Sequence, residues 1–434
     1  MANPRQIAFQ ALLKTEKDGA FSNLALDAVL SKSQLDTRDK SFVSNLFYGV
    51  IERQLTIDYN LSLYLTKPLK KLKPEALTIM RMGAYQILFM DKVPDSAAVN
   101  ESIKLTKKNG ASYASGLINA VLRKVSAKGL VLPENESSDE YLSIKYSCPL
   151  WLTHKWTAEY GKEDTEKLLE ASLGSADTCI RVNTVKTNAD ELIAKLAEDG
   201  ICAEKTYNEN TLKISLRGND IEKLNAFKQG LFHVQDMASQ LCARALDARE
   251  NETVFDLCSA PGGKAYTVCE MMGDKGRVLC FDIYENRVSL ILKGAERLGL
   301  KSIEGSVGDA SVYNENLGFA DKVLCDVPCS GLGIIRRKPE IKYKNEQELA
   351  CLPEIQYSII CNASRYVKVG GRMVYSTCTL SKAENEDICR KFLENHSSFR
   401  PSGVFFEGDE CMKTLMPHKN DSDGFFIACF ERKE

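Results

Sequence analysis

The sequence predicts three kinds of structure in chain order: an all-α bundle, a small α+β module, and an α/β domain with a mostly parallel, doubly wound sheet. Apolar residues recur at helical spacing up to about residue 128, and short strands alternate with helices after residue 236. The stretch 253–264, TVFDLCSAPGGK, joins an apolar strand to a glycine turn and a helix start. Such a unit opens a doubly wound sheet, and ligands bind at its turn.

Length and composition are those of a globular protein with two or three domains, at 434 residues, 44% hydrophobic and 27% charged. No apolar run approaches the ~20 residues of a membrane helix, and the N-terminus lacks a secretory pattern. We therefore expect a cytoplasmic protein with no membrane partner. Fifteen cysteines without a CxxC pair, and four scattered histidines, favour free thiols and predict no metal site.

Residues 1–130 are predicted to form the helical bundle. Asn3 and Pro4 are typical of a helix start, and apolar stripes follow within 42–51, 77–88 and 114–122. This region holds 19 Lys and Arg against 11 Asp and Glu, whereas the rest of the chain is acidic. A basic module on an acidic body indicates a nucleic-acid partner. A well-solvated helical surface explains the same charge equally well.

The next two segments are predicted to be a linker with packing residues, 131–161, and a small α+β module, 162–235. The linker begins in a polar stretch rich in Pro and Ser. The RVNTVKT segment of the module places Arg181 and Asn183 where they either face RNA or serve the structure, and a structural role is favoured. The expected elements of the module after its first helix are a strand at 178–182, a helix at 188–198 and strands near 212–216 and 231–234.

Residues 236–434 are predicted to form the doubly wound domain, because strands and helices alternate at the spacing of a parallel sheet. A strand close to the C-terminus, 425–430, is expected at the sheet edge and antiparallel to its neighbour. The other expected strands are 253–257, 277–281, 303–307, 322–325 and 372–376, and the expected helices are 236–247, 288–298 and 349–367.

Three acidic residues, Asp282, Asp309 and Asp326, come at the ends of consecutive predicted strands. One acid in such a place is commonly a helix cap, but three beside the Gly262-Gly263 turn would meet at one edge of the sheet. They suit a nucleoside with ribose hydroxyl and amino donors. Both GxGxxG and GxxxxGK[ST] are absent, which favours a ligand without phosphate. S-adenosylmethionine is such a ligand, and its sulfur is positively charged.

Two cysteines are also expected at adjacent strand ends: Cys329 in DVPCSGLG and Cys378 in STCTL. A thiol beside a methyl donor suits methylation of a pyrimidine at carbon 5, which is too poor a nucleophile to react alone. A thiolate that adds to carbon 6 makes carbon 5 reactive, so covalent catalysis divides one difficult step into easier ones. The carbon-5 proton must then leave so that the thiol is eliminated, and a second group is expected to assist this step.

CSAPGGK, DVPCSGLG, STCTL and the earlier HVQDMASQL, in this order and spacing, resemble the Sun/Fmu family of bacterial ribosomal-RNA cytosine-5 methyltransferases. The basic helical region resembles the NusB-like RNA-binding domain of the 16S methyltransferase B type, so the resemblance covers nearly the whole chain. It implies a Rossmann-like methyltransferase domain that uses S-adenosylmethionine to methylate a cytosine of 16S ribosomal RNA. The substrate would be naked RNA or a partly assembled small subunit, and we expect a monomer.

The resemblance also implies roles for individual residues. Cys378 matches the attacking cysteine, and Cys329 matches the cysteine that assists product release. Asp326 matches a residue near the cofactor amine and the cytosine ring, Asp282 the ribose-binding acid, and Asp309 a residue near the adenine. The loop on the methionine side of the cofactor is matched by Cys258, Ser259, Ala260, Pro261, Gly262, Gly263 and Lys264.

Two other functions are weighed against this one. In a DNA cytosine-5 methyltransferase the cysteine after proline attacks, so Cys329 would be the nucleophile and Cys378 structural. The sequence has no Glu-Asn-Val motif after DVPCSGLG, which argues against that reading. Alternatively, the chain is a binding protein whose enzyme domain is degenerate and acts as a scaffold. The presence of every expected catalytic residue argues against the scaffold.

Overall fold

The computed structural model describes residues 3–18, 22–216, 218–403 and 410–433. The chain forms two compact units. Unit 1 is Met1–Gly174 together with Arg337–Lys344, and unit 2 is Ser175–Arg336 together with Asn345–Glu434. The finer division of the sequence into four segments stays a prediction. Within the described ranges, no helix is long and apolar enough to cross a membrane.

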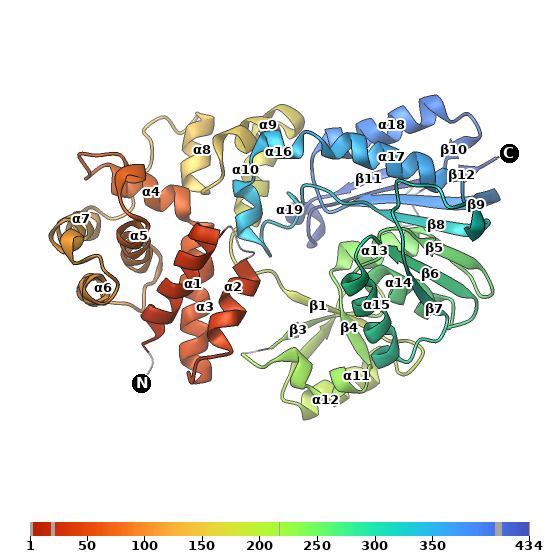
Figure 1. Ribbon diagram of the computed structural model, residues 1–434, viewed down its shortest axis with the longest axis horizontal. Helices are drawn as coiled ribbons and strands as arrows, with labels where there is room; N and C mark the ends of the chain where they lie inside the picture. The colour runs from red at the N-terminus through yellow and green to blue at the C-terminus, as the bar shows by residue number, and fades with distance from the viewer. Residues whose placement is uncertain (1–2, 19–21, 217, 404–409, 434) are drawn as a thin grey trace. The chain divides into compact units, whose positions relative to one another are not determined.

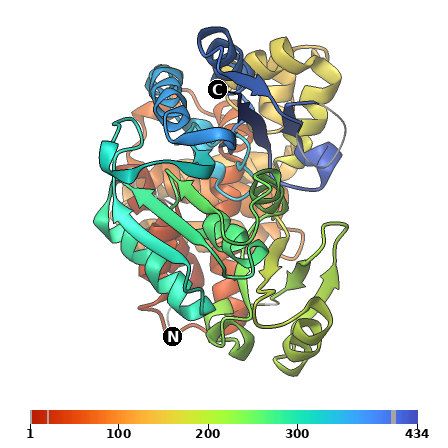
Figure 2. The same cartoon turned by 90° about the vertical axis from the view of Figure 1, so that its right-hand side faces the viewer.

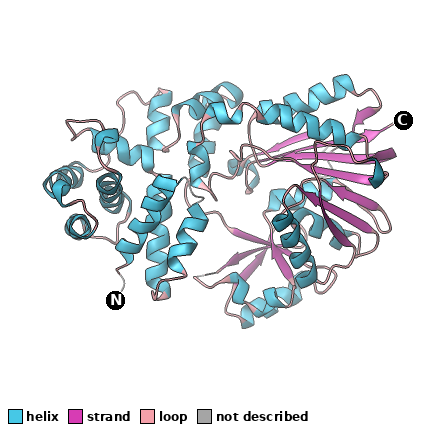
Figure 3. Cartoon of the chain, in the orientation of Figure 1, coloured by secondary structure: helices cyan, strands magenta, loops and turns pink. Residues whose placement is uncertain are grey.

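Unit 1 is helical, as predicted, and its described residues include no strand (Figure 3). The Asn3 side chain accepts a hydrogen bond from the Arg5 backbone N–H at 2.9 Å and so caps the first helix. The stripe at 42–51 lies in the core, where Val43, Leu46 and Phe47 are fully buried. The α-helices are α1 (Pro4–Asp18), α2 (Ser22–Leu30), α3 (Thr37–Glu52), α4 (Gln54–Ser62), α5 (Pro74–Phe89), α6 (Asp95–Lys108), α7 (Ser115–Lys128), α8 (Asp139–Lys145), α9 (Leu150–Tyr160) and α10 (Lys162–Ala171).

Unit 1 also contains a short piece of chain that the sequence analysis did not assign to it, Arg337–Lys344. Its 3₁₀-helix η5 (Pro339–Tyr343) places Tyr343 against the helical core. The Tyr343 hydroxyl donates to the backbone carbonyl of Ile51 at 2.9 Å, and Lys342 Nζ donates to that of Glu52 at 2.6 Å. Lys342 is only 2% exposed, so this piece is anchored by a buried cation.

The first sheet of unit 2 has four antiparallel strands in the order β2-β3-β1-β4 (Figure 1). The sequence analysis missed β2, whose residues are mostly exposed. Arg181 and Asn183 are buried, and Asn183 Nδ2 donates to the carbonyls of Gly230 and Leu298 at 2.8 Å. Their favoured structural role is therefore confirmed. The elements are β1 (Thr178–Val182), α11 (Ala189–Glu198), β2 (Cys202–Lys205), β3 (Thr211–Ser215), α12 (Asn225–Lys228) and β4 (Phe232–Val234).

The second sheet of unit 2 has the order β10-β12-β9-β8-β5-β6-β7, and β11 pairs with β12. The strands β9, β8, β5, β6 and β7 are parallel, which confirms the predicted sheet. The strands are β5 (Thr253–Asp256), β6 (Arg277–Asp282), β7 (Ile303–Val307), β8 (Ala320–Asp326), β9 (Val367–Thr377), β10 (Phe399–Pro401), β11 (Met412–Leu415) and β12 (Phe425–Arg432).

Strand β12 is antiparallel to β9, as expected, but the prediction that it forms the sheet edge is wrong. It lies between β9 and β10 and also pairs with β11. The physical reason is its composition, because Phe425–Phe430 is an unbroken apolar run in which every residue is buried. Such a run is typical of a strand that is covered on both faces.

Helices cover both faces of this sheet (Figure 1, Figure 2). Val254 of β5 packs with residues of α13 (Met237–Ala245), α14 (Gly263–Met271) and α15 (Glu285–Leu298). Its neighbour Phe255 packs on the other face with residues of α17 (Leu352–Ser364) and α18 (Glu386–Asn395). In sheets covered on both faces in this way, ligands bind outside the carboxyl ends of the parallel strands.

Candidate active site

The structure brings the two predicted cysteines together. Cys329 follows β8 and Cys378 follows β9, and these strands are parallel neighbours in which Asp326 lies opposite Ser376. The Sγ atoms of Cys329 and Cys378 are 3.3 Å apart, close enough for one thiol to donate a hydrogen bond to the other. Both side chains are half-buried. Two thiols from distant parts of the sequence therefore meet at one point of the sheet edge.

The backbone around these cysteines is packed through glycines. The Gly333 N–H donates to the Cys378 carbonyl at 2.9 Å, and the Gly424 N–H donates to the Gly333 carbonyl at 2.8 Å. A Cβ atom on Gly333 would lie 1.9 Å from the carbonyl oxygen of Gly424, so no larger residue fits. Gly331 adopts a φ of 77°, which favours glycine. The glycines of DVPCSGLG thus hold the Cys329 loop against the Cys378 loop.

An ion pair lies at the same edge. Lys264 Nζ and Asp326 Oδ2 are 2.7 Å apart, and the Ser376 hydroxyl donates to Asp326 Oδ1 at 2.8 Å. Burial is the largest single influence on the pKa of Lys264 and would lower it. The charges of Asp326, Cys242 and Cys378, together with the hydrogen bond to Asp326, outweigh burial, and the pKa lies above its usual value. Lys264 therefore stays positively charged, and the pair ties the glycine loop to strand β8.

The glycine loop, residues 258–264, connects β5 to α14 in a fixed conformation. Gly262 has a φ of 104°, and a Cβ there would lie 2.5 Å from the ring of Tyr266. The Tyr266 hydroxyl donates to the carbonyls of Pro261 and Ile291 at 3.0 and 2.9 Å. The Ser259 N–H donates to the Phe281 carbonyl of the next strand at 2.8 Å. The loop is thus preorganised by its own sheet.

A pocket of about 210 Å³ opens beside this loop. Its lining combines Asp326 with residues before and within the first turn of α13, such as Gln235 and Ser239. The full lining is Val234, Gln235, Asp236, Ser239, Asp256, Cys258, Ser259, Ala260, Pro261, Gly263, Lys264 and Asp326. Most of the predicted methionine-side loop therefore does line one cavity.

Asp256 is a residue of this pocket that the sequence analysis missed. Its side chain is 1% exposed, and neither carboxylate oxygen has a hydrogen-bond partner among the described residues. Burial raises the pKa of Asp256 to about 7. Ser259 Oγ, also buried, has no partner within the described ranges either. Buried polar groups are nearly always paired, so these atoms point to a ligand. The signal was present in the sequence as an acid at the end of an apolar strand.

The two remaining acids differ from each other. Asp282 is 5% exposed, lies 3.0 Å from Arg287 Nη1, and accepts from the Tyr284 N–H at 3.1 Å. Asp309 is exposed and accepts from the N–H and hydroxyl of Ser311, which lowers its pKa. Neither lines the 210 Å³ pocket. Their cofactor roles stay predictions, and Asp309 also serves as the cap of its own turn.

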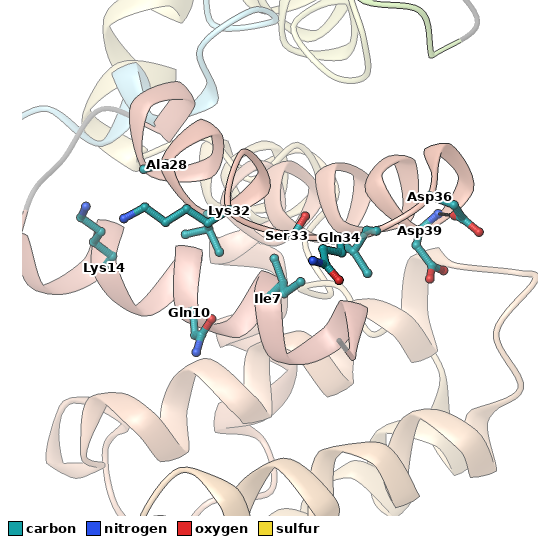
Figure 4. A pocket seen from close by; sticks show the side chains of 11 residues that line it. Ile7, Gln10, Lys14, Ala28, Lys32, Ser33, Gln34, Asp36 and Asp39 are labelled. Carbon is teal, nitrogen blue, oxygen red and sulfur yellow. Dashed lines mark hydrogen bonds between the residues drawn. The ribbon is translucent and has the colours of Figure 1, made fainter. Parts of the chain in front are cut away.

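A larger hollow, of about 880 Å³, lies in unit 1 among α1, α2 and the start of α3 (Figure 4). Lys14 and Lys32 lie toward one end and Asp36 and Asp39 toward the other, and no cysteine lines it. Its lining holds no thiol, so size alone does not make it the reactive site. Among the described residues, no group of three or more His, Cys, Asp or Glu side chains is arranged to hold a metal ion.

Comparisons with known proteins agree with this geometry. Residues 243–431 match the profile of the 16S rRNA methyltransferase RsmB/F family, 2–127 that of the NusB family, and 148–217 that of a ferredoxin-like domain of such methyltransferases. The chain is 36% identical to the probable ribosomal RNA small subunit methyltransferase B of Bacillus subtilis, across 99% of this chain and 98% of that protein. It is 30% identical to the ribosomal RNA small subunit methyltransferase B of Proteus mirabilis, across 99% of each.

Among solved structures, the crystal structure of PH0851 is similar with a TM-score of 0.84 and 27% identity, across 100% of this chain and 99% of that one. The likeness thus spans both units, and the sequence relatives match from end to end. The chain therefore belongs to the ribosomal RNA small subunit methyltransferase B family.

Proposed function

We propose that this protein methylates carbon 5 of a cytosine in 16S ribosomal RNA through a covalent adduct between Cys378 and carbon 6 of the base. The observation that carries the proposal is the 3.3 Å separation of the Cys329 and Cys378 Sγ atoms. Neither cysteine lines the 210 Å³ pocket, but Lys264, which does, interacts electrostatically with Cys378. Methyl transfer to oxygen or nitrogen needs no protein nucleophile, whereas carbon 5 of cytosine must first be activated. A second thiol then has a task, because the adduct must be released.

S-adenosylmethionine would supply the methyl group, and the chain offers residues that fit its parts. Asp256 and Ser259 line the 210 Å³ pocket with buried atoms that lack partners among the described residues, which suits an ammonium group. Asp326 lies close enough to assist. The Asp282 carboxylate would accept the ribose hydroxyls, and Asp309 would lie near the adenine. The loop 258–264 would surround the methionine portion.

The charges around the two thiols support different roles for them. Lys264 interacts electrostatically with Cys378, and a positive charge favours a thiolate there. The pKa of Cys329 is raised well above its usual value by its hydrogen bond with Cys378, by burial, and by the charges of Cys378, Glu384 and Asp326. Cys378 is thus suited to attack. Cys329 keeps its proton and is suited to donate a hydrogen bond to the Cys378 sulfur.

The proposed reaction has three steps. The Cys378 thiolate forms a bond to carbon 6, and the ring takes up a proton from solvent on nitrogen, where the Asp326 carboxylate would stabilise it. Carbon 5 then forms a bond to the methyl carbon, the bond between that carbon and the sulfonium sulfur breaks, and its electron pair leaves with the sulfur of S-adenosylhomocysteine. A water molecule or hydroxide ion takes the carbon-5 proton, the double bond between carbons 5 and 6 re-forms, the bond between carbon 6 and sulfur breaks with its electron pair returning to Cys378, and the ring nitrogen gives its proton back to solvent. Cys329 assists this step because it lies within hydrogen-bonding distance of the departing sulfur.

RNA binding is proposed for the basic residues of the N-terminal region. The side chains of Lys67, Lys70, Lys71 and Lys73 are exposed in the loop before α5, where they can contact phosphates. We expect the affinity for RNA to fall as salt rises, and the slope to flatten when Lys70 and Lys71 are changed to glutamate. The target base must be unpaired or flipped out to reach the thiols. An unchanged salt slope would place the RNA elsewhere.

The decisive experiment compares Cys378→Ala and Cys329→Ala in a methyl-transfer assay with labelled S-adenosylmethionine and 16S RNA. Cys378→Ala should form no covalent protein–RNA complex, whereas Cys329→Ala should accumulate one that survives denaturing electrophoresis. The reverse pattern would assign the attack to Cys329, as in DNA cytosine-5 methyltransferases. Bisulfite sequencing of ribosomal RNA from cells with and without the protein would then identify the cytosine. Failure to bind S-adenosylmethionine in a calorimetric titration would favour the scaffold.

A further inference from the structure

A buried carboxylate, Glu384, is hydrogen-bonded to the residue that follows Cys329 and does not itself touch the reacting atoms. Glu384 ends the short helix η6 (Lys382–Glu384) and is 4% exposed. Its Oε2 accepts from the Ser330 N–H at 2.9 Å, and its Oε1 accepts from the Ser330 hydroxyl at 2.6 Å. Hydrogen bonds of this kind to a charged acceptor are among the strongest in proteins. Glu384 therefore fixes the residue that follows Cys329.

The same network reaches the loop of the other cysteine. The hydroxyls of Ser330 and Thr379 are 2.6 Å apart, so the residue after Cys329 is joined to the residue after Cys378. Gln356 Nε2, from α17, donates both to Glu384 Oε2 and to the carbonyl of Pro328, each at 3.0 Å. Ser330, Thr379 and Gln356 are fully buried. The residues that flank the two cysteines are thus clamped around one charged group.

Burying a carboxylate is costly unless it is paired, because its hydration is lost. A protein that needed only packing here would gain as much from an apolar side chain. The charge has a second effect, because Glu384 is one of the groups that raise the pKa of Cys329. Its contribution is smaller than those of the hydrogen bond with Cys378 and of burial. The position of this carboxylate thus bears on both the geometry of the thiols and the proton of one of them.

We propose that Glu384 is a positioning residue for both thiols: through Ser330 and Thr379 it holds Cys329 and Cys378 at their short separation. In the same place its negative charge opposes a negative charge on Cys329. This inference rests on the proposed function only where it concerns release of the RNA adduct. The effect on the thiols themselves exists without RNA, and it can be measured in the free protein.

The first test is the pH dependence of thiol alkylation in the full-length protein, with iodoacetamide as the probe and the modified cysteines resolved by mass spectrometry. Glu384→Gln removes the charge but keeps an acceptor for the Ser330 N–H. We expect the midpoint for Cys329 to move to lower pH by about one unit. Asp387→Asn is the matched control, because Asp387 is an exposed carboxylate of the following helix. Equal midpoints in Glu384→Gln and the native protein would refute the charge effect.

The second test is the adduct assay with Glu384→Ala, which also removes the acceptors. We expect accumulation of the protein–RNA complex, as for Cys329→Ala, and a fall in kcat of about tenfold or more with the KM for S-adenosylmethionine unchanged. Normal release by Glu384→Ala, with adduct still accumulating in Cys329→Ala, would overturn the positioning role. If neither cysteine variant alters the adduct, the proposed function fails instead, and the alkylation result still decides the role of Glu384. Should Glu384→Ala not fold, Glu384→Gln carries both tests.

Discussion

Replacing Asp256 with asparagine should stabilise the protein at pH 7.5 and flatten the pH dependence of that stability. The pKa of Asp256 rises from 3.8 to about 7 because of burial. A carboxyl with a raised pKa binds its proton more tightly in the folded protein, so its stabilising contribution is full below pH 3.8 and is lost as pH rises through 7. A rise of about three units corresponds to ~4 kcal/mol. About 2 kcal/mol of this stabilising free energy is lost as the pH rises from 5.5 to 7.5.

The assay is scanning calorimetry of the native protein and Asp256→Asn at pH 5.5 and 7.5. Calorimetry is preferred to intrinsic tryptophan fluorescence, because both tryptophans, Trp151 and Trp156, lie in unit 1. For a unit of this size, 2 kcal/mol moves the melting temperature by about 4–8 °C. The control is Asp309→Asn, because the pKa of Asp309 is lowered and its contribution changes only in more acidic solution.

Parallel pH profiles for the native protein and Asp256→Asn would refute the reasoning, since the buried carboxyl would then not titrate in this range. A second readout concerns the ligand. If the ionised carboxylate accepts an ammonium group, affinity for S-adenosylmethionine should rise by up to about tenfold per pH unit below pH 7 and level off above it. Asp256→Asn should bind more weakly and without that slope.

Two further changes test other parts of the chain. Burial lowers the pKa of Lys342 to about 8 in the folded protein. Between pH 8 and 10.5 the lysine has lost its proton in the folded protein but still holds it in the unfolded chain. The free energy of unfolding of the native protein should therefore rise with pH over this range. Lys342→Met should remove that rise, because methionine does not titrate; an unchanged profile would show that Lys342 is hydrated. Gly333→Ala should slow methyl transfer by about tenfold or more, because its Cβ would collide with the Gly424 carbonyl and separate the cysteine loops. Gly116→Ala, where the Cβ meets nothing within 4 Å, is the control, and equal rates for both would exclude the collision.

The sequence predicted those parts of the fold that are determined by residues close together in the chain. The strand ends that carry Asp282 and Asp326 follow from short apolar runs bounded by polar turns, and both strands end at those residues. Strand β12 was misplaced because its neighbours, β10 and β11, are short and carry a weak pattern, so only its unbroken burial reveals an interior position.

The association of Arg337–Lys344 with unit 1 was not predictable for a different reason. The segment lies between two elements of unit 2 in the sequence, and its docking depends on two contacts with backbone carbonyls at the end of α3. Every residue has a backbone carbonyl, so a contact with one leaves no pattern in the sequence from which it could be predicted. Asp256 was missed for yet another reason: the sequence places it at the end of an apolar strand, but its burial and its lack of partners in the described structure cannot be seen there.

The network around the thiols shows why two cysteines of similar surroundings need not be equivalent. At 3.3 Å the two sulfurs cannot both be ionised, because like charges this close repel strongly in a partly buried site. If one sulfur is ionised, the other therefore keeps its proton and can donate a hydrogen bond to it. Lys264 lies where it favours the negative charge on Cys378, and Glu384 disfavours it on Cys329. In the proposed reaction, opposite charges from separate loops would thus select which sulfur attacks and which one holds the proton, so neutralising either charge should weaken that selection.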